Sequence, residues 1–176
     1  YSSDPKEFIT EVVDEAKKVL VATNSKDIKE KKLEEIAKKI ADIKGMGMYT
    51  LGKHRKNLTE EQLNEYDKLF EKYFLKSFSS RLSDYSDPKI KVISAEVLNP
   101  KYTIVKSILI ATDQKPELKI DWRVYTKNSE KPLIRDLIVE GISLARTQKE
   151  EFASIIESDN QNMDKLFFTL NEFIAK

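Results

Sequence analysis

The sequence predicts an α+β fold with several N-terminal helices, a curved four-stranded antiparallel sheet and C-terminal helices. Apolar residues recur with a helical period of about 3.6 up to residue 83 and again after residue 143. Between residues 89 and 140 the period changes to two, in four separate runs. The connections between these runs are of hairpin length, which makes neighbouring strands antiparallel. This order of elements predicts helices packed on one face of the sheet.

Three helices are expected in the N-terminal part of the chain. The first begins at Ser3-Asp4-Pro5, where a capping side chain precedes a proline in the first helical turn. The second covers about Lys26–Lys44, and we expect Gly45 and Gly47 to end it. A short helix then follows over about Met48–Lys56. The first two have the apolar stripe of amphipathic helices.

The longest predicted helix opens at a capping box and carries a stripe of aromatic residues. Thr59 and Gln62 supply the two reciprocal side chains of the box, and the helix continues to about Ser83. The apolar residues of the stripe follow i, i+3, i+4, i+7 spacing. They are Leu63, Tyr66, Phe70, Tyr73, Phe74, Phe78 and Leu82. Such a stripe normally packs into a core, and the alternative is that it walls a ligand cavity.

Four strands are expected over Lys89–Leu98, Tyr102–Thr112, Glu117–Thr126 and Leu133–Glu140. The third strand has the clearest alternation of its two faces. Its apolar face comprises Leu118, Ile120, Trp122 and Val124, and its other face comprises Lys119, Asp121, Arg123 and Tyr125. The aromatic stripe and this apolar face are expected to oppose each other.

The end of the fourth strand is expected to turn directly into a helix. Gly141 suits a sharp change of direction, and Ser143 can cap the helix that follows. The last two helices are expected over about Ser143–Glu157 and Met163–Ala175.

Composition excludes several classes of function. Lys and Arg total 31 against 30 Asp and Glu, so the chain lacks the basic excess of a nucleic-acid-binding protein. The chain has no cysteine, which excludes disulfides, thiol catalysis and cysteine-ligated metals. No apolar run reaches the roughly 18 residues that a membrane-spanning helix needs. At 176 residues, one domain over 1–176 is expected.

Candidates for catalysis are sparse. His54 is the only histidine, and a triad would need it beside a nucleophile and an orienting acid. Ser143 is not followed by the glycine that ends a nucleophile elbow, so it is better explained as a helix cap. Asp121, Asp136 and Glu140 lie on or beside strands, and they are the candidates for a small cone-shaped dehydratase or isomerase. No residue cluster has metal-ligand spacing. We therefore do not expect an enzyme.

Several short motifs occur in a fixed order along the chain. Leu51-Gly52 precedes the capping box at Thr59 and the aromatic helix. Ile120-Asp121-Trp122-Arg123 then has the form of an aromatic strand motif, Phe-x-Trp-Arg/Lys. Glu140-Gly141-Ile142-Ser143-Leu144 follows, with Phe152 nine residues after the serine. Together these motifs resemble the MlaC family of periplasmic phospholipid carriers.

The resemblance covers about Met46–Leu170 and includes two departures from the family pattern. Pro132–Asp136 stands where the family usually carries Trp-x-Val-Tyr-Asp. Thr147-Gln148-Lys149 replaces the usual Asn-Tyr-Arg. The missing Trp and Tyr bear on the lining of the family's lipid pocket and on its partner contacts.

The resemblance implies a single MlaC-like lipid-carrier domain over 1–176, with an apolar cavity between helices and sheet. Such a protein would hold a phospholipid by its acyl chains, as cargo and not as a cofactor. It would shuttle the lipid between an outer-membrane lipoprotein complex and an inner-membrane MCE/ABC transporter complex, which maintains outer-membrane lipid asymmetry. We expect a periplasmic monomer whose signal peptide has been removed. The alternative is a ligand-free protein–protein interaction module.

The expected lipid-binding residues are large apolar side chains of the aromatic helix, the strands and the flanking junctions. They are Leu51, Tyr66, Phe70, Tyr73, Phe74, Phe78, Ile108, Ile110, Ile120, Trp122, Val124, Leu137, Val139, Ile142 and Phe152. Lys53, Arg55 and Lys56 form a basic run that is expected to dock partners or contact lipid phosphate. The alternative for this run is a solvated helix end whose charges complement the helix dipole.

Overall fold

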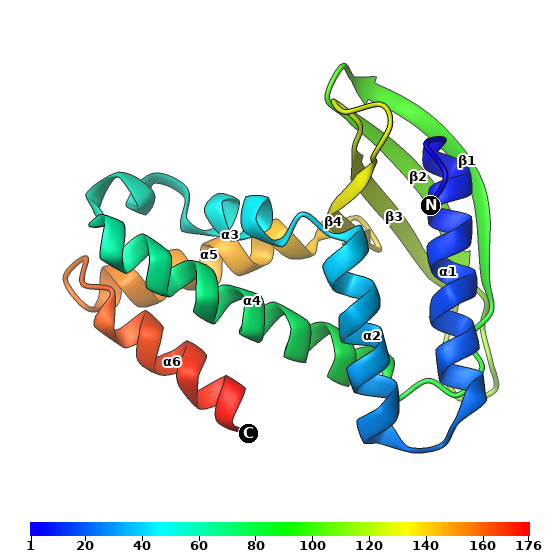
Figure 1. Ribbon diagram of the computed structural model, residues 1–176, viewed down its shortest axis with the longest axis horizontal. Helices are drawn as coiled ribbons and strands as arrows, with labels where there is room; N and C mark the ends of the chain where they lie inside the picture. Colours follow the sequence, from blue (N-terminus) through cyan, green and yellow to red (C-terminus); the bar gives the residue numbers. More distant parts are fainter.

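The computed structural model describes residues 1–176 and has the predicted α+β arrangement, with an open, curled sheet (Figure 1). The helices are α1 (Pro5–Ala22), α2 (Lys26–Ile40), α3 (Ile43–Leu51), the 3-10 helix η1 (Gly52–Asn57), α4 (Glu60–Leu82), α5 (Leu144–Ser158) and α6 (Asp164–Ala175). The strands are β1 (Ile90–Asn99), β2 (Tyr102–Leu109), β3 (Leu118–Tyr125), β4 (Leu133–Val139) and β5 (Ile142–Ser143). No helix combines the length and apolar character that crossing a membrane requires.

Helix starts follow the predicted capping signals. The Asp4 carboxylate accepts a hydrogen bond from the Glu7 amide at the start of α1. Both bonds of the capping box between Thr59 and Gln62 are present at the start of α4. The Ser143 hydroxyl accepts from the Arg146 amide at the start of α5. These side chains satisfy amides that have no partner within the helix.

The predicted boundary between the second and third helices is wrong. α2 ends at Ile40 because Ala41 leaves the helix and forms a β-bridge with Ile134. The Asp42 amide donates to the Ile134 carbonyl at 3.0 Å, and the Asp42 carboxylate then caps α3. This boundary is set by a contact with a distant strand, which local spacing does not encode.

The two glycines that were expected to end a helix lie inside α3 instead. Gly47 is buried, and a Cβ at this position would stand 3.0 Å from Cδ2 of Phe70 on α4. The glycine therefore allows α3 and α4 to approach closely. The helix expected over Met48–Lys56 is divided between the end of α3 and the 3-10 helix η1.

The sheet is an antiparallel meander in the order β1-β2-β3-β4-β5, with five strands and not the four expected. The additional strand β5 has two residues and pairs with the end of β4. Glu140 and Gly141 connect them with positive φ values of 50° and 81°, the combination found in tight type I′ hairpin turns. A strand of this length is too short to show a period in the sequence.

Two apolar cores hold the molecule together. The sheet core joins α1 and α2 to the face of the sheet that contains Val105, Trp122, Val124 and Ile134. We call this the concave face, because Figure 1 shows the sheet curving around α1. The helical core joins α3, α4, α5 and α6 around Tyr66 and Phe70. α4 belongs to the helical core at its N-terminal half and contacts α2 further along.

Candidate functional site

The concave face of the sheet is fully buried at one end, and most apolar residues toward its other end, apart from the buried Leu109, are half-buried. Val105, Trp122 and Val124 are buried by side chains of α1 and α2. Toward the other end of the sheet lies a row of neighbours across four strands, Val92, Ser107, Ile120 and Val139. The apolar residues of this row are only half-buried. Apolar surface therefore remains accessible at this end of the face.

The aromatic stripe of α4 shows the same change. Tyr66 and Phe70 are buried in the helical core, whereas Phe74 and Phe78 are half-buried. The rings of Phe70, Phe74 and Phe78 stack in sequence, with centroid separations of 6.3 and 6.0 Å. The C-terminal half of α4 thus carries aromatic surface that the protein itself does not fully cover.

The C-terminal end of α4 lies near the end of the sheet at which β1 begins. A short link connects the end of α4 at Leu82 to the start of β1 at Ile90, and both of these residues are half-buried. Lys115, in the connection between β2 and β3, places its Nζ 3.8 Å from the ring centroid of Tyr85 in this link. The end of α4 and the half-buried end of the sheet are therefore neighbours.

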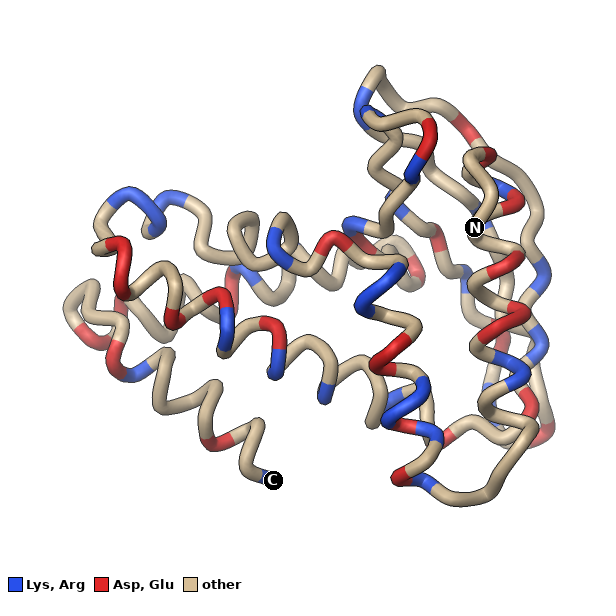
Figure 2. Tube along the Cα trace, in the orientation of Figure 1, with Lys and Arg blue, Asp and Glu red and all other residues tan.

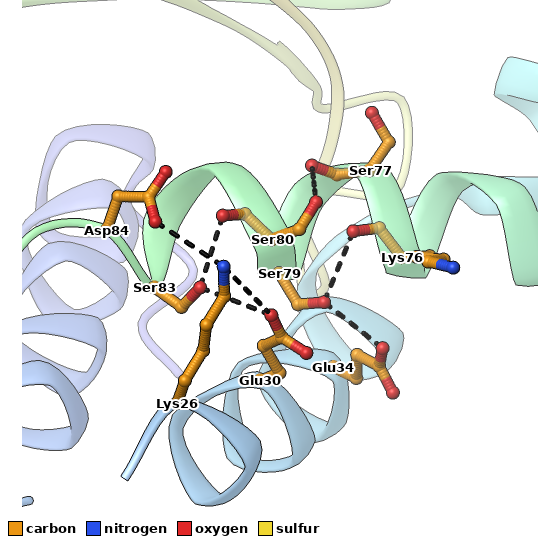
Figure 3. Close-up of polar contacts among 9 residues, drawn as sticks. All are labelled: Lys26, Glu30, Glu34, Lys76, Ser77, Ser79, Ser80, Ser83 and Asp84. Carbon is orange, nitrogen blue, oxygen red and sulfur yellow. Dashed lines mark hydrogen bonds and ion pairs between the residues drawn. The ribbon is translucent and has the colours of Figure 1, made fainter. Parts of the chain in front are cut away.

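α4 contacts α2 through a row of polar side chains, here called the polar seam, and not through its aromatic stripe. The Ser79 hydroxyl donates to Glu34 at 3.1 Å, and the Ser83 hydroxyl donates to Glu30 at 3.4 Å (Figure 3). Lys26 extends the seam with ion pairs to Glu30 and to the loop that follows α4. At about 100° per residue, Ser79 lies roughly 140° around the helix from Phe74. The phenyl rings consequently point away from the serine face.

Polar atoms within the two apolar surfaces have partners in the protein. The indole N–H of Trp122 donates to the Ser107 hydroxyl at 2.9 Å, and that hydroxyl donates to the Ile120 carbonyl at 2.7 Å. On α4, the Tyr73 hydroxyl donates to Gln148 at 2.7 Å. Burial raises the pKa of Tyr73, so this phenol stays neutral. Neither surface needs a polar ligand to satisfy these groups.

The predicted lipid-binding residues fall into three groups. Those buried in the two cores are Leu51, Tyr66, Phe70, Phe152, Trp122 and Val124. Those half-buried at the edges of the cores, or beside them, are Tyr73, Phe74, Phe78, Ile120, Leu137 and Val139. The remaining three lie elsewhere, with Ile108 on the opposite face of the sheet, Ile110 just beyond β2 and Ile142 exposed on β5.

Sequence reasoning missed part of the half-buried surface. Ile90 and Val92 on β1 pack at the edge of the sheet core. β1 is an edge strand whose second half is exposed, so it lacks a regular alternation of buried and exposed residues. The apolar character of its first residues was the available signal.

An apolar cavity between the helices and the sheet was expected, and the structure does not show one. A pocket of about 350 Å³ lies instead against α2, α3 and α4. Its walls include Lys38, Lys44 and Lys68, which do not suit acyl chains. The half-buried residues of α4 and of the sheet form an accessible apolar surface.

The basic run on η1 divides into exposed and buried members. Lys53, Arg55 and Lys56 are exposed, and Figure 2 shows basic residues gathered on this segment. His54 is buried at 4% exposure, and its Nε2 lies 3.7 Å from Glu157 without a hydrogen bond. Lys53 reaches the same Glu157 carboxylate at 3.8 Å.

The three carboxylates considered for catalysis do not share a site. The Asp136 carboxylate accepts from the Ser143 hydroxyl and from the Ala145 amide, so it fixes the start of α5. Glu140 accepts from the Lys119 amide at 3.1 Å, beside the turn. Asp121 lies on the face of β3 opposite to Trp122. No group of three or more His, Asp or Glu is placed to hold a metal ion.

Comparison with known proteins gives a family and a similar structure. The family model described as MlaC protein matches residues 7–172. Among solved structures, the chain is similar to a phospholipid-binding protein from Ralstonia solanacearum that was solved in complex with a phospholipid. The sequence identity is 17%, the TM-score is 0.82, and the alignment covers 98% of this chain and 97% of that one. At this identity the likeness establishes a shared fold. No match was found among curated proteins.

Proposed function

This chain belongs to the MlaC family, and on that basis we propose that it is a periplasmic carrier that holds a phospholipid by its acyl chains. It shuttles this cargo between an outer-membrane lipoprotein complex and an inner-membrane MCE/ABC transporter complex, and thereby maintains outer-membrane lipid asymmetry. The family and its phospholipid-bound structural relative both point to a binding or transport protein and not to an enzyme.

The observation that carries this proposal is the pair of half-buried apolar surfaces on α4 and on the concave face. Removing apolar area from water is favourable by about 25 cal/mol per Å², so a ligand that covers these residues gains free energy. Phe78 and Ile120 stay half-buried at one end of two well-packed cores. An acyl chain between these surfaces completes their burial.

The half-buried residues among the predicted lipid-binding side chains contact the phospholipid directly. Phe74, Phe78, Ile120, Leu137 and Val139 supply the walls, and Ile142 stands exposed at the edge of the sheet beside Val139. Residues buried in the two cores support these walls from behind. The acyl chains enter between the C-terminal half of α4 and the sheet, where neither core fills the space.

Energetics favour transfer within docked complexes. Burial of a methylene is worth about 0.8 kcal/mol, so two acyl chains of lipid length contribute on the order of 20 kcal/mol. Release into water is correspondingly slow, and handover requires a partner that offers a competing apolar site. The exposed side chains of Lys53, Arg55 and Lys56 on η1 are candidate contacts for one of these partners.

Lipid uptake from vesicles tests the proposal. Delipidated protein is mixed with vesicles of phosphatidylethanolamine and phosphatidylglycerol, re-isolated by size exclusion, and assayed for bound phospholipid. The wild type is expected to acquire lipid, and Phe78→Asp is expected to lose most of it because a carboxylate then lies among the acyl chains. Phe168→Asp is the matched control, since Phe168 is 64% exposed on α6. Failure of the wild type to acquire lipid contradicts the proposal.

A further inference from the structure

The face of the sheet opposite to α1 and α2, here called the convex face, has no helix over its centre. α1 contacts β1 and β2 from the concave side, and α3 and α5 reach the sheet at β4. Figure 1 shows nothing outside the curve of β1 and β2. Ile104 and Ile108 are half-buried on this face. The carrier function described above uses the other face and leaves this one unexplained.

Two arginines and two tyrosines form a stacked platform on the convex face. The Arg123 guanidinium lies 5.4 Å from the ring centroid of Tyr102, and Tyr102 meets Tyr125 edge-on at 5.6 Å. Arg135 lies 4.6 Å over Tyr125 and donates to the Tyr102 hydroxyl at 3.0 Å. The Asp42 carboxylate anchors Arg135 at 2.6 Å. These contacts hold the platform in one arrangement.

Within this platform the charge of Arg123 is not neutralised. Arg135 pairs with Asp42, whereas Arg123 takes part in none of the ion pairs of the protein. Its cross-strand neighbour Asp136 directs its carboxylate to the start of α5. The Arg123 Nε is buried and has no hydrogen-bond partner. The terminal N–H groups of Arg123 are also free of hydrogen bonds within the protein, and the planar fork that they form suits a carboxylate at an interface.

The outward faces of β1, β2 and β3 carry an excess of positive charge, whereas β4 adds the carboxylate of Asp136 beside Arg123. Cations at outward positions of β1, β2 and β3 outnumber carboxylates. The cations are Lys91, Lys106, Lys119 and Arg123, and the carboxylates are Glu96 and Asp121. Lys106 and Glu96 pair with each other at 3.8 Å. The face thus combines half-buried isoleucines and tyrosines with unpaired positive charge.

We propose that the convex face is a docking surface for a protein partner that presents an acidic side chain among apolar ones, with Arg123 receiving the carboxylate. Electrostatic complementarity of this kind steers association and fixes the orientation of the partner. Docking on this face leaves the concave face and α4 free to exchange lipid. The identity of the partner as one of the two transport complexes rests on the proposed function, whereas its acidic and apolar character rests on the face itself.

Direct binding to the two proposed partners tests this inference. The purified MCE protein and outer-membrane lipoprotein from the same genome are immobilised in turn, and affinity is measured by biolayer interferometry. Arg123→Glu is expected to weaken binding to at least one of them by tenfold or more. Arg123→Gln keeps a planar polar side chain without charge and is expected to have a smaller effect. Arg146→Glu, an exposed arginine on α5, is the matched control. Circular dichroism confirms that each variant is folded.

The outcomes separate docking from cargo binding. Unchanged affinity in Arg123→Glu, or binding of the wild type to neither partner, overturns the proposal. Loss in Lys53→Glu/Lys56→Glu without loss in Arg123→Glu places docking on η1 and also overturns it. In a further outcome, the protein binds neither partner but co-sediments with phosphatidylglycerol vesicles in a manner that depends on Arg123. That result identifies a membrane surface as the partner and contradicts the proposal. A protein without lipid that still docks through Arg123 contradicts the carrier function alone.

Discussion

Single polar side chains keep the apolar surfaces of this protein free of unpaired groups. Trp122 contributes a large ring to the concave face, and its N–H is bound by Ser107, which is only 2% exposed. Without this partner the indole would place an unsatisfied donor in an apolar site, which is costly. The residue pattern predicted Trp122 on the correct face of β3. Its partnership with Ser107 was not predictable, because it depends on the register of β2 against β3.

Ser107→Ala is expected to destabilise the protein by about 1–3 kcal/mol, because it leaves the Trp122 N–H unsatisfied. Urea unfolding of both proteins measures the difference. Ser94→Ala on the edge strand β1 is the matched control. Ser94 is half-buried, and its hydroxyl is not the partner of the Trp122 N–H. Equal stability of Ser107→Ala and wild type would show that the indole N–H does not depend on the serine.

Tyr66 gives a prediction about pH. Burial raises the pKa of its phenol above the ordinary value of 10.0, and its hydroxyl is bonded to Thr50 at 2.6 Å. The folded protein therefore keeps the proton where the unfolded chain releases it. Stability from this group is complete below pH 10.0 and is lost as pH rises toward the folded-state pKa.

The measurement for Tyr66 compares the free energy of unfolding at about pH 9 and about pH 11. Wild type is expected to lose more stability between these two values than Tyr66→Phe does. The variant lacks the Thr50 bond at both pH values, so this loss cancels in the comparison. An identical decline in the two proteins would mean that the Tyr66 phenol does not contribute.

At the scale of elements, local signals predicted helix starts and hairpins, and tertiary contacts decided the rest. The caps at Asp4, Thr59 and Ser143 lie where the sequence predicted them. The end of α2 was misplaced because it depends on the bridge from Ala41 to Ile134. Periodicity also identified the aromatic stripe of α4, but a stripe has the same period whether it meets a core or a ligand. The division of α4 into a buried and a half-buried half emerged only from the packing.

The division of α4 predicts that alanine substitution in its buried half mainly lowers stability, whereas substitution in its half-buried half mainly lowers lipid binding. Phe70 is 4% exposed in the helical core, so Phe70→Ala is expected to cost about 3–5 kcal/mol of stability. Phe78 is half-buried, so Phe78→Ala is expected to cost clearly less stability but to reduce bound phospholipid more per unit of lost stability. Denaturant unfolding of lipid-free protein and lipid analysis of the folded variants measure the two effects. If both variants lose the same amount of bound lipid per kcal/mol of lost stability, Phe78 has no direct contact with the lipid.

At the scale of the whole molecule, two apolar cores meet along a polar seam, and accessible apolar surface remains at one end of both. The order of helices, hairpins and helices predicted the overall architecture. It did not predict that the sheet and helical cores would be separate, because core membership depends on which faces meet in three dimensions. We propose different tasks for the two faces of this sheet, cargo binding for the concave face and partner docking for the convex face.

The most direct test of the central claim is mass spectrometry of a solvent extract from the protein, purified without detergent. We predict phospholipid in stoichiometric amount, with acyl chains of lengths that fit between α4 and the sheet. An extract free of phospholipid, from a protein that also takes up none from vesicles, would contradict the carrier function and favour a ligand-free interaction module.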